Sequence, residues 1–329
     1  MVDALCSAGT TEVVAGVRRP SPRLERFPVK LVHCDLMDRG SLEKALRGIE
    51  VVIHCARDPA KGATVEGTRH LLEAIRARSV KRLVQMSSIA VYGDASGIIT
   101  EDVPASPIDQ YGEEKFAEEK LCQAAAGPDL TVAVVRPSLV YGPFGDLWTG
   151  RFIEGIAAGR LRQLGKDGRG QANLIYVVDL ARFAAELSLR PLPEYSVYNA
   201  NGAEIPTFDE YFDRLSRALG QGPLPVSERR AIPKGLRRQV RRAARLLLRT
   251  QQATLKKITH GKPNLESALS AIEQTLQRDV NDEPSSRFSR HVVYSNDQAR
   301  RVGLQPRTSL QDGVNASVEW AKSRGLIKQ

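Results

Sequence analysis

The sequence has little of what would tie the protein to a disulfide framework, a metal or a membrane. It has only four cysteines in 329 residues, none in a CxxC spacing, so we expect reduced thiols and no metal site. No stretch approaches the roughly 20 uninterrupted apolar residues of a membrane span, and the first residues lack the basic and apolar regions of a signal peptide. These absences predict a cytoplasmic protein.

Acidic residues are absent from one segment, residues 229–257, which holds 11 lysines and arginines and carries the whole net charge of +10. Apolar residues recur there at helical spacing and arginines occupy the other side, which predicts a basic amphipathic helix. Two interpretations stay open: a helix packed on the protein with a solvated arginine face, or peripheral docking on an anionic membrane. Few aromatic residues lie among the arginines, so we do not expect nucleic acid as a partner.

Short apolar runs alternate with helical patterns in the first half of the chain. The runs predict strands at residues 12–17, 31–35, 51–56, 82–86 and 131–136. Apolar residues at helical spacing predict helices at 41–46, 64–78 and 112–126. Continuous apolar strands alternating with amphipathic helices predict an α/β fold, a doubly wound, Rossmann-like parallel sheet covered on both faces.

The pattern becomes mixed after residue 145, which predicts a second, smaller lobe. A short strand is expected at 173–177, with helices at 179–189 and 207–219. We therefore divide the chain into a nucleotide-binding domain, residues 1–145 with 173–200, and a substrate lobe, residues 146–172 and 201–329.

The candidate catalytic residues follow the strand predicted at 82–86. Tyr111 and Lys115 are four residues apart, so they share one face of the predicted helix. Hydride transfer at a carbinol carbon needs a group that exchanges the hydroxyl proton, and a tyrosine does so near neutral pH when a cation depresses its pKa. Ser88 ends the preceding strand, where it can hydrogen-bond the same substrate oxygen. Since ligands of such sheets bind beyond the carboxyl ends of the strands, Ala56, Ser87 and Ser88 are placed for binding or catalysis.

At these residues the chain resembles the extended short-chain dehydrogenase/reductase family of the NAD-dependent epimerase/dehydratase type, which contains nucleotide-sugar epimerases and dehydratases. The segments that carry the resemblance are VEGTRHLLEA at 65–74, SSIAVYG at 87–93, YGEEK at 111–115, RPSLVYGP at 136–143 and NLIYVVDLA at 173–181. The resemblance implies that Ser88, Tyr111 and Lys115 are catalytic. It further implies cofactor contacts for a set of residues that follow the strands: Asp35 and Leu36 at adenine, Ala56 and Ser87 along the cofactor, and Pro137, Ser138 and Leu139 at nicotinamide.

One departure from the family concerns the phosphate-binding loop. Family members open with a strand and a glycine-rich turn, whose N–H groups and following helix hold the pyrophosphate. Residues 1–8 of this chain resemble the end of that helix, and the glycine-rich run at 165–170 comes too late and is expected to be a surface turn. The sequence either begins inside a longer protein, which we favour, or belongs to a shortened relative with little affinity for the cofactor.

The preferred cofactor is predicted from the residues after the strand at 12–17. An acidic residue there would hold the ribose hydroxyls of NAD, whereas Arg18 and Arg19 can pair with a 2′-phosphate. NADP is therefore favoured, and NAD remains possible.

The activity expected from the residues and the resemblance is oxidation, reduction or epimerisation at a carbinol carbon of a nucleotide sugar or related small molecule. Two alternatives stay open: a reductase of a lipid-linked or sterol-like alcohol at the membrane surface, and a non-catalytic scaffold with a relict site. The resemblance also implies a possible homodimer paired through the helices predicted at 64–78 and 112–126.

Overall fold

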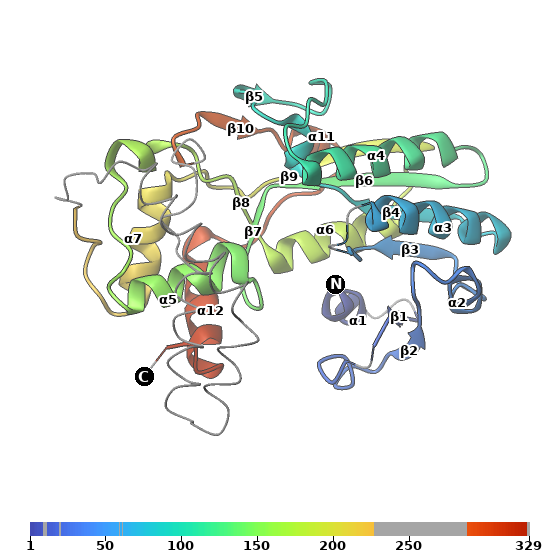
Figure 1. Cartoon of the computed structure of the whole chain (residues 1–329), viewed down its shortest axis with the longest axis horizontal. Coiled ribbons are helices and arrows are strands. Elements are labelled where there is room, and N and C mark those ends of the chain that lie inside the picture. The colour runs from blue at the N-terminus through green and yellow to red at the C-terminus, as the bar shows by residue number, and fades with distance from the viewer. Residues whose placement is uncertain (9–11, 20, 59, 61, 227–287, 328–329) are drawn as a thin grey trace, which may run out of the picture.

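The computed structural model describes the chain except for residues 9–11, 20, 59, 61, 227–287 and 328–329 (Figure 1). The basic amphipathic helix predicted at 229–257 lies outside the described residues. Within the described ranges, no helix combines the length and the apolar character that crossing a bilayer requires.

A parallel sheet of four strands forms the centre of the molecule. Its order is β3 (Val51–His54), β4 (Arg82–Met86), β6 (Thr131–Pro137) and β9 (Tyr195–Ala200). Strands β1 (Val14–Val17) and β2 (Lys30–His33) pair in parallel as a separate two-stranded sheet. The parallel pairing arises because a helix or a longer connection follows each of these strands and returns the chain to the same edge.

Helices cover both faces of this sheet (Figure 1). Val132 and Val134 of β6 belong to the core shared with α3 (Ala63–Ala77) and α4 (Gln110–Ala125), whereas Ala133 and Val135 belong to the core shared with α6 (Val177–Leu189). This alternation follows from the two-residue period of a strand, and the continuous apolar run at 132–135 is what a strand buried on both faces needs. The predicted α/β, doubly wound parallel fold is confirmed.

Shorter elements surround the central sheet. The described ones are α1 (Val2–Ala8), α2 (Arg39–Ala45), the single turn η1 (Ile89–Tyr92), β5 (Gly97–Ile99), which pairs in parallel with β10 (Val292–Tyr294), and α11 (Asp297–Arg301). Helix α2 begins after Asp38, whose side chain accepts from the Ser41 backbone N–H.

A second apolar core lies to one side of the sheet. It is built around β7 (Leu139–Tyr141), η2 (Asp146–Gly150), α5 (Arg151–Ala157), β8 (Leu174–Tyr176), α7 (Phe208–Ala218) and α12 (Leu310–Ser323). The glycine-rich run at 165–170 forms the short turn η3 (Gly165–Arg169), with the Leu164 and Gly165 N–H groups donating to Asp209. The division into a nucleotide-binding domain and a substrate lobe stays a prediction.

Buried asparagines connect this core to the end of the chain. Asn201 donates to the Asn173 side chain at 2.8 Å, and its backbone N–H donates to the Asn296 side chain at 2.8 Å. Asn173 in turn donates to the Val292 carbonyl at 2.8 Å. Residues after 288 are thereby hydrogen-bonded to the interior, where each of these amides has a partner.

Candidate active site

Ser88 lies just beyond the carboxyl end of β4 and caps the turn η1. Its hydroxyl oxygen accepts from the Ala90 N–H at 3.1 Å, and the side chain is partly buried. Because a hydroxyl also carries a hydrogen, Ser88 keeps a donor for a ligand oxygen. The sequence prediction that Ser88 follows a central strand is correct.

Helix α4 brings Tyr111 close to this turn. The helix begins after Asp109, whose carboxylate accepts from the Gly112 N–H at 2.8 Å. A Cβ added at Gly112 would lie 2.6 Å from the carbonyl oxygen of Ala90, so only glycine allows the first turn of α4 to approach η1 this closely. Tyr111, the preceding residue, is therefore positioned next to the turn that Ser88 begins.

Lys115 lies one helical turn further along, and its ammonium is buried at the end of β4. Its Nζ donates to the Met86 carbonyl oxygen at 2.9 Å and lies 2.8 Å from the Glu118 carboxylate. The side chain is 7% exposed and that of Glu118 is fully buried. The structure thus places Ser88 and the Lys115 ammonium at the carboxyl end of β4, with Tyr111 at the start of the helix that packs against the turn after Ser88.

Arg57 also belongs to this group, and sequence reasoning missed it. Its guanidinium carbon lies 4.8 Å from the centroid of the Tyr111 ring, within cation–π range. The loop that carries it is held by Thr64, whose hydroxyl donates to the Asp58 carbonyl and accepts from the Asp58 N–H. The available signal was its position directly after Ala56, at the end of a strand that reaches the same edge of the sheet.

Three of the predicted adenine-side and cofactor-path residues follow β2 and β3. The Asp35 carboxylate accepts from the Met37 N–H at 2.9 Å, which closes the turn after β2. Leu36 packs against α3, where a Cβ at Gly67 would lie 2.8 Å from the Leu36 Cβ. Ala56 is exposed, beyond the end of β3.

The remaining predicted cofactor residues follow β1, β4 and β6. Arg18 and Arg19 are exposed after β1, and Arg18 forms an ion pair with Asp58 at 2.8 Å. Hydrogen bonds from the Ala60 N–H and Arg18 lower the pKa of the Asp58 carboxyl. Pro137 ends β6, Ser138 follows it, and Leu139 begins β7.

Two serines predicted at the cofactor direct their hydroxyls into the protein. Ser138 donates to the Asn201 side chain at 2.9 Å. Ser87 donates to the carboxylate of Glu119, which also accepts two hydrogen bonds from Arg136 at 3.0 and 2.7 Å. These interactions fix the loops after β4 and β6 rather than leaving the hydroxyls exposed at the edge of the sheet.

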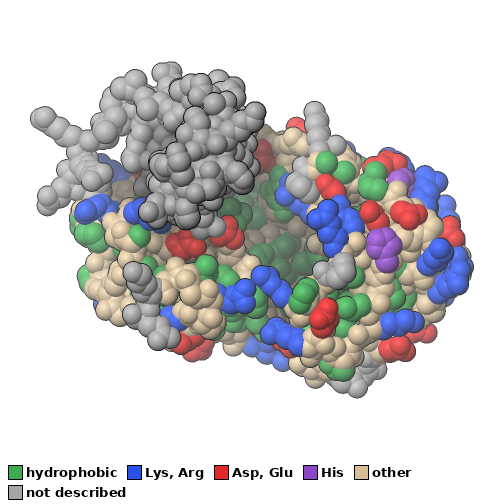
Figure 2. All heavy atoms as spheres, turned by 60° about the horizontal axis from the view of Figure 1, so that its bottom comes forward, with side chains coloured by type: hydrophobic (Ala, Val, Ile, Leu, Met, Phe, Trp, Pro, Cys, Tyr) green, Lys and Arg blue, Asp and Glu red, His purple; other side chains and the backbone are tan. Residues whose placement is uncertain are grey.

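A hollow opens between the two parts of the molecule in Figure 2. Hydrophobic side chains lie in its depth, and charged side chains of both signs, several lysines and arginines among them, lie at its rim. An apolar depth with charged groups at the entrance is the usual character of a site for a small organic ligand.

The chain belongs to the NAD dependent epimerase/dehydratase family, whose model matches residues 1–200. The N-acetyl-alpha-D-glucosaminyl-diphospho-ditrans,octacis-undecaprenol 4-epimerase of Escherichia coli O157:H7 is 27% identical over 177 residues, which cover 50% of this chain and 53% of that protein. The sterol demethylase protein B of Methylococcus capsulatus is 26% identical over 355 aligned positions, covering 99% of this chain and 95% of that protein.

Among solved structures, MoeE5 in complex with UDP-glucuronic acid and NAD is similar, with a TM-score of 0.70 and 23% identity. The similarity covers 98% of this chain and 95% of MoeE5. At that identity the likeness shows the fold. The chain spans about half the length of several curated relatives that it matches.

Proposed function

We propose that this protein catalyses NAD(P)-linked hydride transfer at a carbinol carbon, with Tyr111 as the group that exchanges the hydroxyl proton. The observation that carries the proposal is the placement of Ser88 and the Lys115 ammonium at the carboxyl end of β4, with Tyr111 at the start of the helix that packs against the turn after Ser88, in a member of the NAD dependent epimerase/dehydratase family. Ligands of open parallel sheets bind at this edge.

The residues at this edge fit a nicotinamide dinucleotide. Ala56 follows a partly buried strand and is nevertheless exposed, so the end of β3 is open to a ligand. Arg18 and Arg19 are exposed after β1, with Arg18 reaching the loop after β3 through its ion pair with Asp58, and their guanidinium groups suit phosphate. When bound, such a cofactor accepts or supplies the hydride.

The protein's own residues handle the proton and orient the substrate. Ser88 donates a hydrogen bond to the substrate oxygen and fixes its position. Tyr111 removes the hydroxyl proton during oxidation and returns it during reduction. The Arg57 guanidinium lies over the Tyr111 ring and Lys115 lies one helical turn further along α4, and in this proposal both positive charges stabilise the charge that develops on the Tyr111 oxygen during proton transfer.

For the substrate, we propose a nucleotide sugar, which MoeE5 binds in its solved complex. The lysine and arginine side chains at the rim of the hollow suit the diphosphate of such a ligand (Figure 2). The test is a panel of UDP- and dTDP-sugars incubated with the full chain and NAD⁺ or NADP⁺, read by cofactor absorbance and by chromatography of the sugar products. Cofactor binding without turnover of any sugar would contradict this substrate class.

A second candidate is a lipid-linked or sterol-like alcohol. Two observations favour it: the similarity to sterol demethylase protein B extends over almost the whole chain, and hydrophobic side chains line the depth of the hollow. This function would suit peripheral membrane contact through residues 229–257. Turnover of a 3β-hydroxysterol but of no nucleotide sugar would favour this second candidate. A folded chain that binds neither NADH nor NADPH would instead favour the non-catalytic scaffold.

The choice of cofactor gives a direct prediction. We expect NADPH to bind about tenfold more tightly than NADH, because Arg18 and Arg19 each form a charge-assisted hydrogen bond with the 2′-phosphate. Titration of the chain, followed by nicotinamide fluorescence, measures both affinities. The Arg18→Ala/Arg19→Ala variant should lose this preference and keep its NADH affinity. Equal affinities in the unaltered chain would assign the arginines another role, such as the ion pair with Asp58.

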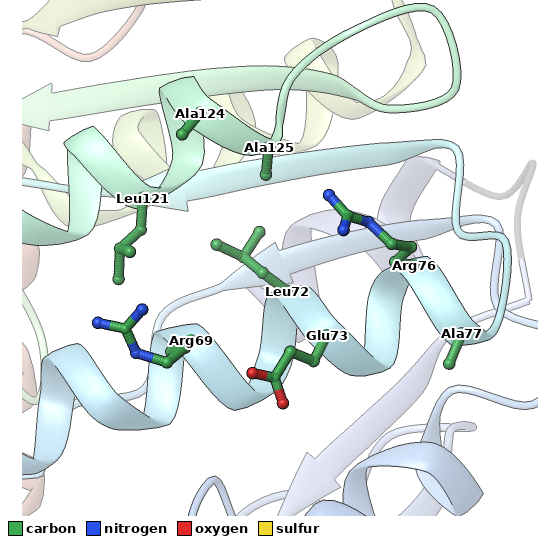
Figure 3. Close-up of a pocket in the computed structure, with 8 residues that line it drawn as sticks. All are labelled: Arg69, Leu72, Glu73, Arg76, Ala77, Leu121, Ala124 and Ala125. Carbon is green, nitrogen blue, oxygen red and sulfur yellow. The ribbon is translucent and has the colours of Figure 1, made fainter.

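We also propose that two copies pair through α3 and α4. A groove runs between these helices, and Leu72 and Leu121 project into it, both partly exposed (Figure 3). Arg69, Glu73 and Arg76 border it, so charges of both signs surround an apolar centre, as in many protein interfaces.

Light scattering of the eluting protein tests this pairing. The unaltered chain should show twice the mass of one copy, and Leu72→Glu should show the single mass because it buries a carboxylate in the interface. Exposed Glu113 on α4 lies outside the groove, so Glu113→Gln is the control that should stay dimeric. A single mass for the unaltered chain would overturn the pairing.

A further inference from the structure

A buried carboxylate, Glu118, lies against the ammonium of Lys115. The two residues are three positions apart on α4, and Nζ and Oε2 are 2.8 Å apart. Oε2 has no further hydrogen-bond partner among the described residues, whereas Oε1 accepts from the Thr68 hydroxyl at 2.8 Å. One oxygen of Glu118 is thus held by α3 and the other faces Lys115.

The burial of the Lys115 ammonium makes its contact with Glu118 important. Lys115 has little solvent around it, and a buried ammonium is strongly disfavoured unless an opposite charge or hydrogen bonds compensate for the lost hydration. Within the described structure, the compensating groups are the Met86 carbonyl oxygen and the Glu118 carboxylate. Met86 supplies a dipole, so Glu118 is the only full negative charge in contact with Nζ among the described residues.

No other titratable group described near Lys115 takes the place of Glu118 as its negatively charged partner. His54, at the end of β3, is buried, and its burial and the Lys115 charge lower its pKa to about 4, so it is neutral at physiological pH. Burial raises the pKa of the Cys122 thiol. Glu114 is engaged at the helix start by Gln110 and the Gly62 N–H. The remaining charged or titratable neighbours are Arg57 and Tyr111, which lie on the cofactor side, and Cys55 beyond β3.

We propose that Glu118 is a positioning residue for Lys115: its carboxylate holds the ammonium at the carboxyl end of β4 and compensates its charge, so that Lys115 stays protonated beside Tyr111. The proposal rests on the assignment of Lys115 to the catalytic site. It adds to the serine, tyrosine and lysine a fourth side chain, which acts through Lys115 rather than on the substrate.

Titration of Lys115 in the ligand-free full chain tests this directly. In a chain labelled with ¹³C- and ¹⁵N-lysine, the Lys115 side-chain signal is assigned by its loss in Lys115→Met and followed with pH by NMR. Glu118→Gln keeps the size of the side chain and an acceptor for Thr68, and it removes the charge. We expect it to lower the titration midpoint of Lys115 by about one pH unit or more.

Glu119→Gln is the matched control, because Glu119 is a buried carboxylate on the same helix that pairs with Arg136 instead. It should leave the Lys115 midpoint unchanged. An unchanged midpoint in Glu118→Gln, or an equal shift in both variants, would overturn the proposal. If Glu118→Gln does not fold, Glu118→Asp keeps the charge but withdraws it by one methylene, and a midpoint equal to that of the unaltered chain would be the contrary result.

The rate of turnover gives an independent measure. Glu118→Gln removes the carboxylate that holds the Lys115 ammonium in place, so kcat should fall. The same substitution in a Lys115→Met background should lower kcat no further. Since the NMR titration needs no substrate or cofactor, its result stays decisive even if the proposed activity is not found.

Discussion

Tyr111→Phe is expected to reduce turnover by roughly 100-fold or more, because it removes the hydroxyl that exchanges the substrate proton, a contribution of about 10²–10⁴ in general acid–base catalysis. The phenyl ring still fills the space beneath Arg57, so the fold should be retained. The measurement is kcat for the best substrate found in the panel, together with the thermal unfolding midpoint.

Tyr195→Phe is the control for this experiment. Tyr195 begins β9 and therefore lies at the amino edge of the sheet, away from the carboxyl ends where Ser88 and Lys115 meet. Its turnover should equal that of the unaltered chain. Equal turnover in Tyr111→Phe would remove Tyr111 from the mechanism, whereas loss of activity together with loss of folding would indicate a structural role.

Glu119→Leu is expected to lower the free energy of unfolding by about 3–5 kcal/mol, because it leaves the Arg136 guanidinium buried without its carboxylate. The side chains of Arg136 and Glu119 are 7% and 3% exposed. Burial opposes the charge of Arg136, but its hydrogen bonds with Glu119 outweigh that effect and raise its pKa. Denaturant unfolding followed by circular dichroism measures the loss.

Two further variants distinguish the loss of the buried Arg136–Glu119 ion pair from a general effect of substitution on helix α4. Glu113→Gln, on the exposed side of the same helix, should change the unfolding free energy by no more than about 0.5 kcal/mol. Arg136→Met combined with Glu119→Leu should recover part of the loss, because no unpaired charge remains. A loss below about 1 kcal/mol in Glu119→Leu would mean that Arg136 reaches water or another partner.

The parallel, doubly wound character of the sheet could be predicted from the sequence because its signals are local. Apolar runs separated by amphipathic stretches predict parallel strands joined by helices, whereas the order β3-β4-β6-β9 was not predicted. The residues at which the strands end were harder to predict from the sequence. The run at 31–35 ends as a strand at His33, because Cys34 and Asp35 enter a turn closed by the Asp35 carboxylate and the Ser41 hydroxyl.

The candidate site was predictable to the extent that it depends on spacing along one helix and on strand ends. Tyr111, Lys115 and Ser88 satisfy both conditions. The contacts of Arg57 with Tyr111 and of Thr68 with Glu118 join residues 54 and 50 positions apart in the sequence. Such pairs depend on how α3, α4 and the loop after β3 pack, which no periodicity in a single segment specifies. Ser87 illustrates the same point, since its hydroxyl faces Glu119 from across the fold.

The buried asparagines that join Asn173 and Asn201 to the end of the chain have a consequence for the order of assembly. Their partners after residue 288 are 95 to 119 positions away. Contacts of such separation form slowly, because a long loop must close before any interaction compensates for its entropy. During synthesis, the central sheet can therefore form before Val292 and Asn296, the partners of Asn173 and Asn201, have left the ribosome. Until then the apolar residues that pack against Val292 and Tyr294, among them Tyr92 and Ile99, stay uncovered, and transiently exposed apolar surface is what promotes aggregation.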